Sequence, residues 1–170
     1  MRAALGLGAN LGNPRLSLTI AVAHILADPW VGRLRRSSFY DTDPVGGPEQ
    51  PDYVNAVAVV DLQPGHSPDE AAEHLLELAQ RIEDELHRVR DVRWGPRTVD
   101  VDVLAVADLV MTDPRLTVPH PRAAQRAFVL VPWAEVDPDF TIPGIGSVSA
   151  ALEHIPEQDK VGVRRLAKDG

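Results

Sequence analysis

YVNAVAVVDL, residues 53–62, is followed after a short turn by SPDEAAEHLLELAQRIEDELHRV, residues 67–89, and these two segments decide the fold. The first segment predicts a strand, because its alternate side chains can be assigned to two opposite faces. One face carries Tyr53, Asn55, Val57 and Val59, and the other carries Val54, Ala56, Ala58 and Val60. The second segment predicts a helix.

The helix prediction rests on the first turn and on one apolar stripe. Ser67 stands at the N-cap, Pro68 at the first helical position and Glu70 at the third, which together make a capping box. Apolar residues then recur at alternating steps of four and three, namely Leu75, Ala79, Ile82, Leu86 and Val89. A stripe of this kind packs against a core.

The flanking sequence completes a recognisable order of elements. It predicts a strand at 2–9, a helix at 14–28 that Pro29 stops, a strand at 31–41 and, after the long helix, a strand at 97–107. This order is the ferredoxin-like βαββαβ arrangement, an α+β fold in which two helices cover one face of an antiparallel sheet. Further along we expect a proline-punctuated loop at 115–122, a helix from about Pro121 until Pro132 and a short C-terminal helix near 147–155. Repeats and linkers are not evident, so we expect one domain over 1–170.

Composition narrows the class of protein. The 170 residues include no cysteine, and the formal net charge is −8. The length is sufficient for a packed core without disulfides, and the acidic balance argues against a general nucleic-acid binder. The sequence contains neither a secretion signal nor the ~18 consecutive apolar residues that a membrane helix needs. We therefore expect a cytoplasmic monomer with no nucleic-acid or membrane partner.

The basic residues are unevenly chosen and unevenly placed. Lys160 and Lys168 are the only lysines, and eight arginines lie between Arg81 and Arg126. A GC-rich genome would also explain the shortage of lysine. The clustering is more informative, since the rigid fork of donors on arginine suits phosphate oxygens. In an acidic chain it indicates a phosphorylated small ligand.

Asp100 and Asp102 form the first candidate site. Residues two apart on a strand face the same side, while Val99, Val101 and Val103 enter the core. Paired carboxylates suit Mg²⁺, which keeps several waters and takes substrate phosphates as further ligands. A solvated edge strand with alternating acids would show the same pattern.

The residues before this pair favour the metal interpretation. Arg88, Arg90, Arg93 and Arg97 precede it, and Trp94-Gly95-Pro96 marks a tight turn. Cations beside a metal pair are what phosphoryl transfer requires, because negative charge spreads over non-bridging oxygens in its transition state. Salt bridges with Glu83, Asp84, Glu85 and Asp91 are the alternative, most plausibly for Arg90.

Two further clusters are candidates. His120 lies between two prolines before an expected helix start, where it could donate to an anion, or act only as a structural cap. Arg122 and Arg126 would lie one helical turn apart and reach one phosphate. Tyr53 and Asn55, next to the long loop 42–52, offer an aromatic surface beside an amide, which suits a flat heterocycle, although core packing of Tyr53 would also explain them.

Two nucleotide-binding motifs are absent. Gly6-x-Gly8-x-x-x-Gly12 lacks the spacing of the dinucleotide fingerprint and the acidic residue that should follow it. The Walker pattern G-x-x-x-x-G-K-[ST] does not occur. Any ATP site is therefore of another type.

Together these segments resemble the 6-hydroxymethyl-7,8-dihydropterin pyrophosphokinase family of folate biosynthesis. The likeness runs in order through LGLGANLGNP, FYDTDPVGGPEQPDYVNAV, RVRDVRWGPRTVDVDVL and LTVPHPRAAQRAFVLVPWAEV. It implies a ferredoxin-like fold and transfer of diphosphate from ATP to the hydroxymethyl oxygen of the pterin, with release of AMP. It also implies two Mg²⁺ ions, held by Asp100 and Asp102, as cofactors.

The resemblance also implies roles for other residues. The catalytic, phosphate-neutralising side chains would be Arg88, Arg97, His120 and Arg126, beside Asp100 and Asp102. ATP would also contact Gln80, Glu83, Arg90, Trp94, Val103, Arg115, Leu116 and Thr117. The pterin would lie between Tyr53 and Phe128, bonded through Asn55 and the backbone of Thr42, Asp43, Pro44 and Val45, with Trp94 on a loop that closes over it.

The chain departs from the family at two positions. Asp43 stands where the family often has proline, and Asp91 where a basic residue can occur. Two other functions fit the sequence: a ferredoxin-like module that binds a small molecule without catalysis, and another metal-dependent nucleotidyl or phosphoryl transferase.

Overall fold

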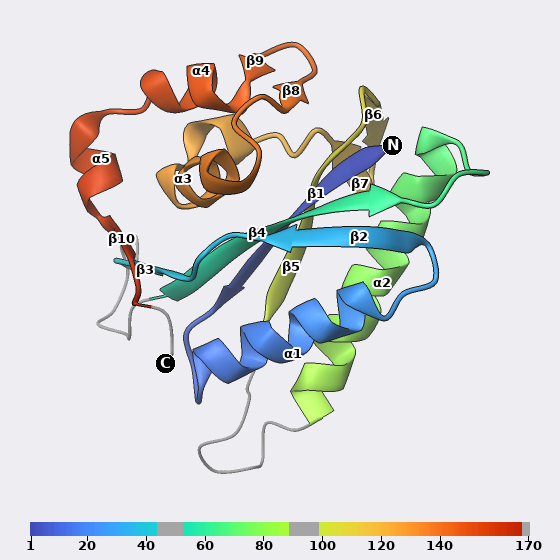
Figure 1. Ribbon diagram of the computed structural model, residues 1–170, viewed down its shortest axis with the longest axis horizontal. Coiled ribbons are helices and arrows are strands. Elements are labelled where there is room, and N and C mark those ends of the chain that lie inside the picture. Colours follow the sequence, from blue (N-terminus) through green and yellow to red (C-terminus); the bar gives the residue numbers. More distant parts are fainter. Residues whose placement is uncertain (44–52, 89–98, 168–170) are drawn as a thin grey trace.

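The computed structural model describes residues 1–43, 53–88 and 99–167, and of Arg88 only the main chain (Figure 1). Its main sheet contains β1 (Arg2–Ala9), β2 (Val31–Arg36), β3 (Tyr40–Thr42), β4 (Tyr53–Leu62), β5 (Asp100–Val106) and β10 (Val163–Arg165). The strand order is β10-β3-β4-β1-β5, β2 also pairs with β4, and every pairing is antiparallel. The predicted ferredoxin-like arrangement is confirmed.

Helices α1 (Pro14–Leu26) and α2 (Pro68–Arg88) cover one face of this sheet (Figure 1). Leu18 and Leu75 of the helices belong to the same buried core as Leu5 of β1 and Val60 of β4. The predicted capping box is present: the Glu70 N–H donates to Ser67 Oγ at 3.2 Å, and the Ser67 N–H donates to Glu70 Oε1 at 3.1 Å. The first turn of α2 is therefore closed by its own side chains.

The opposite face carries a second core beneath α3 (Ala127–Val136) and α4 (Val148–Glu153). Leu130 and Trp133 of α3 are completely buried against Val57 and Val59 of β4. The two predicted faces of β4 thus pack against different helical layers. Only part of this face is covered, and the uncovered part carries the site described below.

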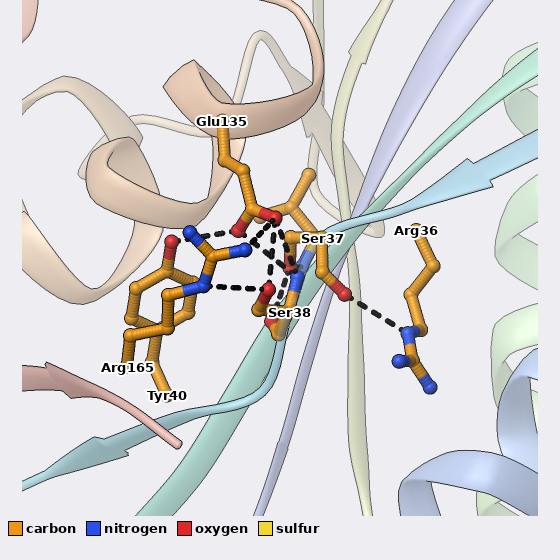
Figure 2. A network of polar contacts seen from close by, with 7 residues as sticks. Arg36, Ser37, Ser38, Tyr40, Glu135 and Arg165 are labelled. Atoms are coloured by element: carbon orange, nitrogen blue, oxygen red, sulfur yellow. Dashed lines mark hydrogen bonds and ion pairs between the residues drawn. The ribbon is translucent and has the colours of Figure 1, made fainter. Parts of the chain in front are cut away.

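The strand expected at 31–41 is wrong in one respect, because it is broken into β2 and β3. Arg36 pairs with Ala58 and Tyr40 with Asn55, so the strand carries one residue more than β4 does across the interval. Side chains bind the main chain at this bulge: the Val57 N–H donates to Ser37 Oγ at 2.9 Å, and the Ser38 N–H donates to Glu135 of α3. Figure 2 shows these contacts converging beside β4.

Two predictions for residues 115–136 are corrected. Part of the expected loop is β7 (Leu116–Val118), which pairs with β6 (Met111–Asp113). The expected helix is a 3₁₀ turn, η1 (Ala123–Gln125), followed by α3, which continues past Pro132. Pro132 is buried and its neighbour Trp133 packs in the core with residues of β4, and this burial outweighs the one main-chain bond that proline removes.

The C-terminal region contains more structure than the sequence indicates. The short helix near 147–155 is confirmed as α4, after a small hairpin of β8 (Thr141–Ile142) and β9 (Gly146–Ser147). Helix α5 (Glu157–Val161) and strand β10 were not predicted. The pairing of β10 with β3 depends on a partner about 120 residues earlier, which local sequence patterns do not reveal. Over the described ranges, no helix is long and apolar enough to cross a membrane.

Replacing Ser67 by alanine should lower the free energy of unfolding by about 1 kcal/mol, because the cap of α2 loses its acceptor. Urea denaturation measures the change. Ser67→Asp is the matched control, since aspartate caps as well as serine and should keep the stability. Equal stability of the alanine variant and the parent would contradict the role given to the cap.

Candidate functional site

A cleft of about 760 Å³ opens on the face of the sheet that α3 only partly covers. Its floor is β1, which lies between β4 and β5 in the sheet, and Gly6 and Gly8 of this strand line the cleft. A Cβ on Gly8 would lie 2.9 Å from Asn55 Oδ1, and one on Gly6 would lie 3.3 Å from Leu104 Cδ2. Glycine at both positions keeps the floor low and lets these neighbours lie across it.

Strand register arranges the side chains on the two sides of this floor. Gly8 pairs with Asn55 of β4 on one side and with Asp100 of β5 on the other. Gly6 likewise pairs with β4 on one side and with Asp102 on the other. Neighbouring strands lie about 4.8 Å apart, so the main chains of Asn55 and Asp100 stand about 10 Å apart with only Gly8 between them.

The β4 side of the cleft combines rings with a fixed amide. Tyr53, Asn55 and Phe128 line it together with Thr42. Asn55 is 7% exposed, and its Nδ2 donates to Thr42 Oγ1 at 2.9 Å. This bond holds the amide in place, and the second Nδ2 hydrogen and the Oδ1 remain able to bond a ligand. The arrangement suits a flat heterocycle with hydrogen-bonding edges.

The β5 side of the cleft is acidic. Asp100 and Asp102 both line it, while Val101 and Val103 are buried beneath α1 and α2. Burial and the neighbouring charge of Asp102 raise the pKa of Asp100, with His87 acting in the opposite sense. A cation between the two carboxylates would relieve this repulsion, so the pair fits Mg²⁺. Among the described residues no group of three or more acids or histidines is arranged to hold a metal ion by itself, so the other ligands would be waters or phosphate oxygens.

Glu83 of α2 adds a third carboxylate near this pair. Partial burial, followed by the charge of Asp100, raises its pKa to about 7, although a hydrogen bond from the Val101 N–H opposes the shift. Strand β5 lies at the end of the strand order, so its outer edge is available to side chains. Glu83 therefore connects α2 to the edge strand that carries the acids.

His120 lies close enough to Asp102 and Arg126 for their charges to affect its pKa. The His120 N–H donates to Leu104 O of β5 at 2.8 Å, and its ring Nδ1 accepts from the Arg122 N–H at 3.2 Å. Nε2 then carries the ring proton. Burial lowers the pKa of His120, and Arg126 and Arg122 lower it further while Asp102 opposes them. Neutral His120 can still donate one hydrogen bond to an anion.

Arg126 lines the cleft, and the carbon at the centre of its guanidinium lies 5.5 Å from the centre of the Phe128 ring. It is the N-cap residue of α3, whereas Arg122 precedes η1. The expectation that these arginines lie one turn apart on a single helix is therefore wrong. Of the two, Arg126 is the one that lines the cleft.

The structure places the remaining predicted residues in three ways. Thr42 and Asp43 line the cleft with the residues above. Among the described residues expected to contact ATP, Arg126 lines the cleft, and the others lie outside its lining, namely Gln80, Glu83, Val103, Arg115, Leu116, Thr117 and His120. The side chain of Arg88 and all of Pro44, Val45, Arg90, Asp91, Trp94 and Arg97 lie outside the described residues.

The side chains of Val103 and Arg115 are already engaged in contacts within the protein. The Val103 side chain is 4% exposed in the core, so any contact would come from its main chain, which points to the same strand edge as that of Val101. Arg115 is occupied by ion pairs to Glu73 at 2.9 Å and to Asp113 at 3.6 Å. A phosphate would have to compete with these acids.

Two groups of lining residues were missed by the sequence interpretation. Gly6 and Gly8 were considered only as a failed dinucleotide motif, although two glycines two apart on a strand share one face and signal a hollow there. The C-terminal segment contributes Gln158, Asp159, Gly162 and Val163. No local signal marks these four, since they reach the cleft only through the pairing of β10 with β3.

Comparison with known proteins points to one family. The profile of the family described as "7,8-dihydro-6-hydroxymethylpterin-pyrophosphokinase (HPPK)" matches residues 4–138. A 2-amino-4-hydroxy-6-hydroxymethyldihydropteridine pyrophosphokinase of Methylorubrum extorquens is 40% identical over 166 residues, covering 97% of this chain and 98% of the relative. The enzyme of that name from Pseudomonas aeruginosa is 40% identical over 165 residues, covering 97% and 96%.

Solved structures agree with the fold. The crystal structure of Plasmodium falciparum HPPK-DHPS wild type with pteroate matches 96% of this chain with a TM-score of 0.69, at 12% identity. This chain spans 47% of that longer one, so the likeness concerns about half of it. At such low identity the match supports the shared architecture.

The pKa of Glu83 predicts a specific pH dependence of stability. Because its folded pKa of about 7 lies above the ordinary 4.5, the folded state holds the proton more tightly, and stability should fall as pH rises from about 4.5 to 7. Without Mg²⁺, Glu83→Gln should remove this part of the decline in melting temperature. Glu77→Gln, on an exposed position of α2, is the control. Identical pH profiles for parent and Glu83→Gln would refute the shifted pKa.

Proposed function

The chain belongs to the 7,8-dihydro-6-hydroxymethylpterin-pyrophosphokinase family, and we propose that the glycine-floored cleft is where it carries out the family reaction. It transfers diphosphate from ATP to the hydroxymethyl group of 6-hydroxymethyl-7,8-dihydropterin, in folate biosynthesis, giving AMP and the pterin diphosphate. The observation that supports this location is the register of Asn55 and Asp100 on opposite sides of Gly8.

On the β4 side, we assign the pterin to the space between Tyr53 and Phe128. Aromatic rings stack favourably on a flat bicyclic ligand. Asn55 would bond the edge of the heterocycle, since Thr42 already fixes the orientation of its amide. The main chain of Thr42 and Asp43, with Pro44 and Val45 beyond the described residues, would complete the recognition.

On the β5 side, we assign the triphosphate of ATP to Asp100 and Asp102. The family is Mg²⁺-dependent, and the paired carboxylates fit two such ions. Bound there, Mg²⁺ would neutralise charge on the phosphate oxygens. Arg126, at the start of α3, and the Nε2–H of His120, before η1, would add hydrogen-bond donors to the phosphate oxygens. Arg88 and Arg97 would add further donors.

The chain's own contribution to the reaction is alignment. The hydroxymethyl oxygen attacks the β-phosphorus, the bond from that phosphorus to the α-phosphate oxygen breaks, and AMP leaves. About 10 Å separates the main chains of Asn55 and Asp100, and we assign the pterin with its hydroxymethyl arm to the space above the strand between them. Holding the two reactants in line across it converts a bimolecular encounter into a local one.

The outer edge of β5 is the proposed nucleotide side. Gln80 and Glu83 of α2, the main chain of Val103, and Arg115, Leu116 and Thr117 near β7 would contact ATP there. Contacts between α2 and β5 and between β5 and β7 bring these elements together. Arg90 and Trp94 would contribute from outside the described residues, Trp94 by closing over both substrates.

We further propose that residues 1–170 act as one pyrophosphokinase domain, as a monomer and in the cytoplasm. Among the described residues, the exposed large apolar side chains include Leu11, Leu26, Val110 and Ile145, which belong to four separate segments of the chain. Its nucleotide substrate, ATP, is a cytoplasmic metabolite.

Incubation with ATP, Mg²⁺ and 6-hydroxymethyl-7,8-dihydropterin should yield AMP and the pterin diphosphate in equal amounts. Chromatography of the products measures both. Omitting the pterin should leave ATP intact. Formation of ADP would instead indicate a different phosphoryl transferase, and nucleotide binding that is indifferent to Mg²⁺, without turnover, would indicate a non-catalytic binding module.

Asp100→Asn and Asp102→Asn should each lower kcat/KM by at least about 100-fold, because a charge that holds the phosphate-bound cations is lost. Melting temperature without Mg²⁺ should stay equal or rise, since the repulsion between the acids is removed. Asp108→Asn, an exposed aspartate beyond the end of β5, is the control. Wild-type turnover in either site variant would exclude these acids as metal ligands.

A further inference from the structure

The C-terminal strap, residues 157–165, consists of α5 and β10 and leads from the region of α4 to β3 (Figure 1). Its strand β10 pairs with β3, so that Val163 lies opposite Thr42 and Arg164 opposite Asp41. The Asp43 N–H donates to Gly162 O at 3.3 Å, which extends the pairing by one residue. The strap is thus bonded to the end of β3 that enters the cleft.

The strap also forms part of the cleft wall. Gln158, Asp159, Gly162 and Val163 line the cleft beside Thr42. Thr42 in turn accepts the hydrogen bond that orients the Asn55 amide. A displacement of β3 would therefore reach the amide directly.

Two arginines of the strap hold it in different places. Arg165 Nε donates to Ser38 Oγ at 3.0 Å, and its guanidinium lies 3.5 Å from Glu135 Oε2. Glu135 of α3 also accepts from Tyr40 Oη at 2.6 Å and from the Ser38 N–H at 2.9 Å (Figure 2). Arg165 therefore fixes the strap to α3 and to the bulge between β2 and β3, away from the cleft.

Arg164 holds the cleft end of β3. Its NH2 group lies 2.9 Å from Asp43 Oδ1 and 3.2 Å from Asp41 Oδ2. This guanidinium holds the pKa of Asp43 below its usual range, so that the carboxylate stays charged over the working pH range. All three side chains are partly solvent-exposed, 45% for Arg164 and 62% for Asp43. Exposed ion pairs contribute little to global stability, so the effect expected of this cluster is local.

We propose that the strap is part of the substrate site and that Arg164 is a positioning residue for the pterin: by binding Asp41 and Asp43 it sets the place of Thr42, and through Thr42 that of Asn55. This inference rests on the proposed function, because it places the pterin beside Asn55. A role confined to holding the fold together would make Arg164 matter equally for both substrates and for turnover.

Steady-state kinetics of the full-length chain, with each substrate varied in turn, test the proposal. Arg164→Ala should raise the KM for 6-hydroxymethyl-7,8-dihydropterin about three- to tenfold, the range expected from losing one or two exposed ion pairs. The KM for ATP and kcat should stay within about twofold, since a lost positioning contact weakens binding of the pterin alone. Arg164→Lys should give an intermediate value, because a single ammonium cannot present the arginine fork to both carboxylates.

Arg2→Ala is the matched control. Arg2 is 48% exposed and also pairs with two aspartates, Asp61 at 3.5 Å and Asp137 at 3.0 Å, but it lies at the other end of β1 from the cleft. It should leave both KM values unchanged. Raising the salt concentration should also narrow the KM difference between the parent and Arg164→Ala, because salt screens an exposed pair.

Three results would overturn the proposal: an unchanged KM for the pterin in Arg164→Ala, an equal rise in the KM for ATP, or a loss confined to kcat. If the alanine variant does not fold, Arg164→Lys and the salt dependence of the parent's pterin KM decide the question in the same way. Failure of the proposed function can be told apart from failure of the Arg164 proposal, because the parent protein itself would then convert no pterin.

Discussion

The absence of side chains at two alternate positions of the central strand is the constraint on which the site depends. Every neighbour of β1 is set by antiparallel register, and the register brings Asn55 and Asp100 to Gly8 from opposite sides. A methyl group at Gly8 would meet Asn55 Oδ1 at 2.9 Å, closer than such atoms normally approach. The same glycine therefore leaves room for a ligand and allows the amide to lie flat over the strand.

The carboxylates on the β5 side of this floor repel one another, which is unfavourable unless a cation lies between them. Burial raises the pKa of both Asp100 and Glu83, and the charge of Asp102 adds to the shift of Asp100 as the charge of Asp100 adds to that of Glu83. A bound cation would offset the repulsion between the carboxylates, so that metal binding would stabilise their charged forms. His120, by contrast, is held as a neutral donor by burial and by nearby arginines. The acids would attract the metal, and the donors around them would receive the phosphate oxygens.

The layer that carries α3 is connected to the β4 side of the cleft by a polar network around Glu135. Burial alone would raise the pKa of Glu135, but hydrogen bonds from Tyr40 and Ser38 lower it below its usual range. The same contacts bind main-chain groups at the bulge, where the ladder to β4 is interrupted. Because Arg165 joins this network and its neighbour Arg164 binds Asp43, the last strand connects the helical layer to the cleft wall. Asp43, where the family often has proline, thus has an ionic partner in this chain.

The sequence by itself determined the elements whose signals are local. The capping box at Ser67 and Glu70, the alternation along β4 and the order of strands and helices up to β5 all follow from nearest neighbours and periodicity, and the ferredoxin-like fold follows from their order. The pairing of Asp100 with Asp102 on one strand face is local in the same sense. The roles of residues that lie outside the described ranges, such as Trp94 and Arg97, remain predictions.

Only the tertiary structure decided what long-range pairing brings together. The extra residue between β2 and β3 is visible only against β4, and α3 continues through Pro132 because the buried neighbours on the sheet outweigh one lost main-chain bond. Gly6 and Gly8 became a floor, and residues 158–163 became a wall, only once register and the pairing of β10 were known. Periodicity reports which face of an element is apolar, but the identity of the partner on that face is a property of the folded chain.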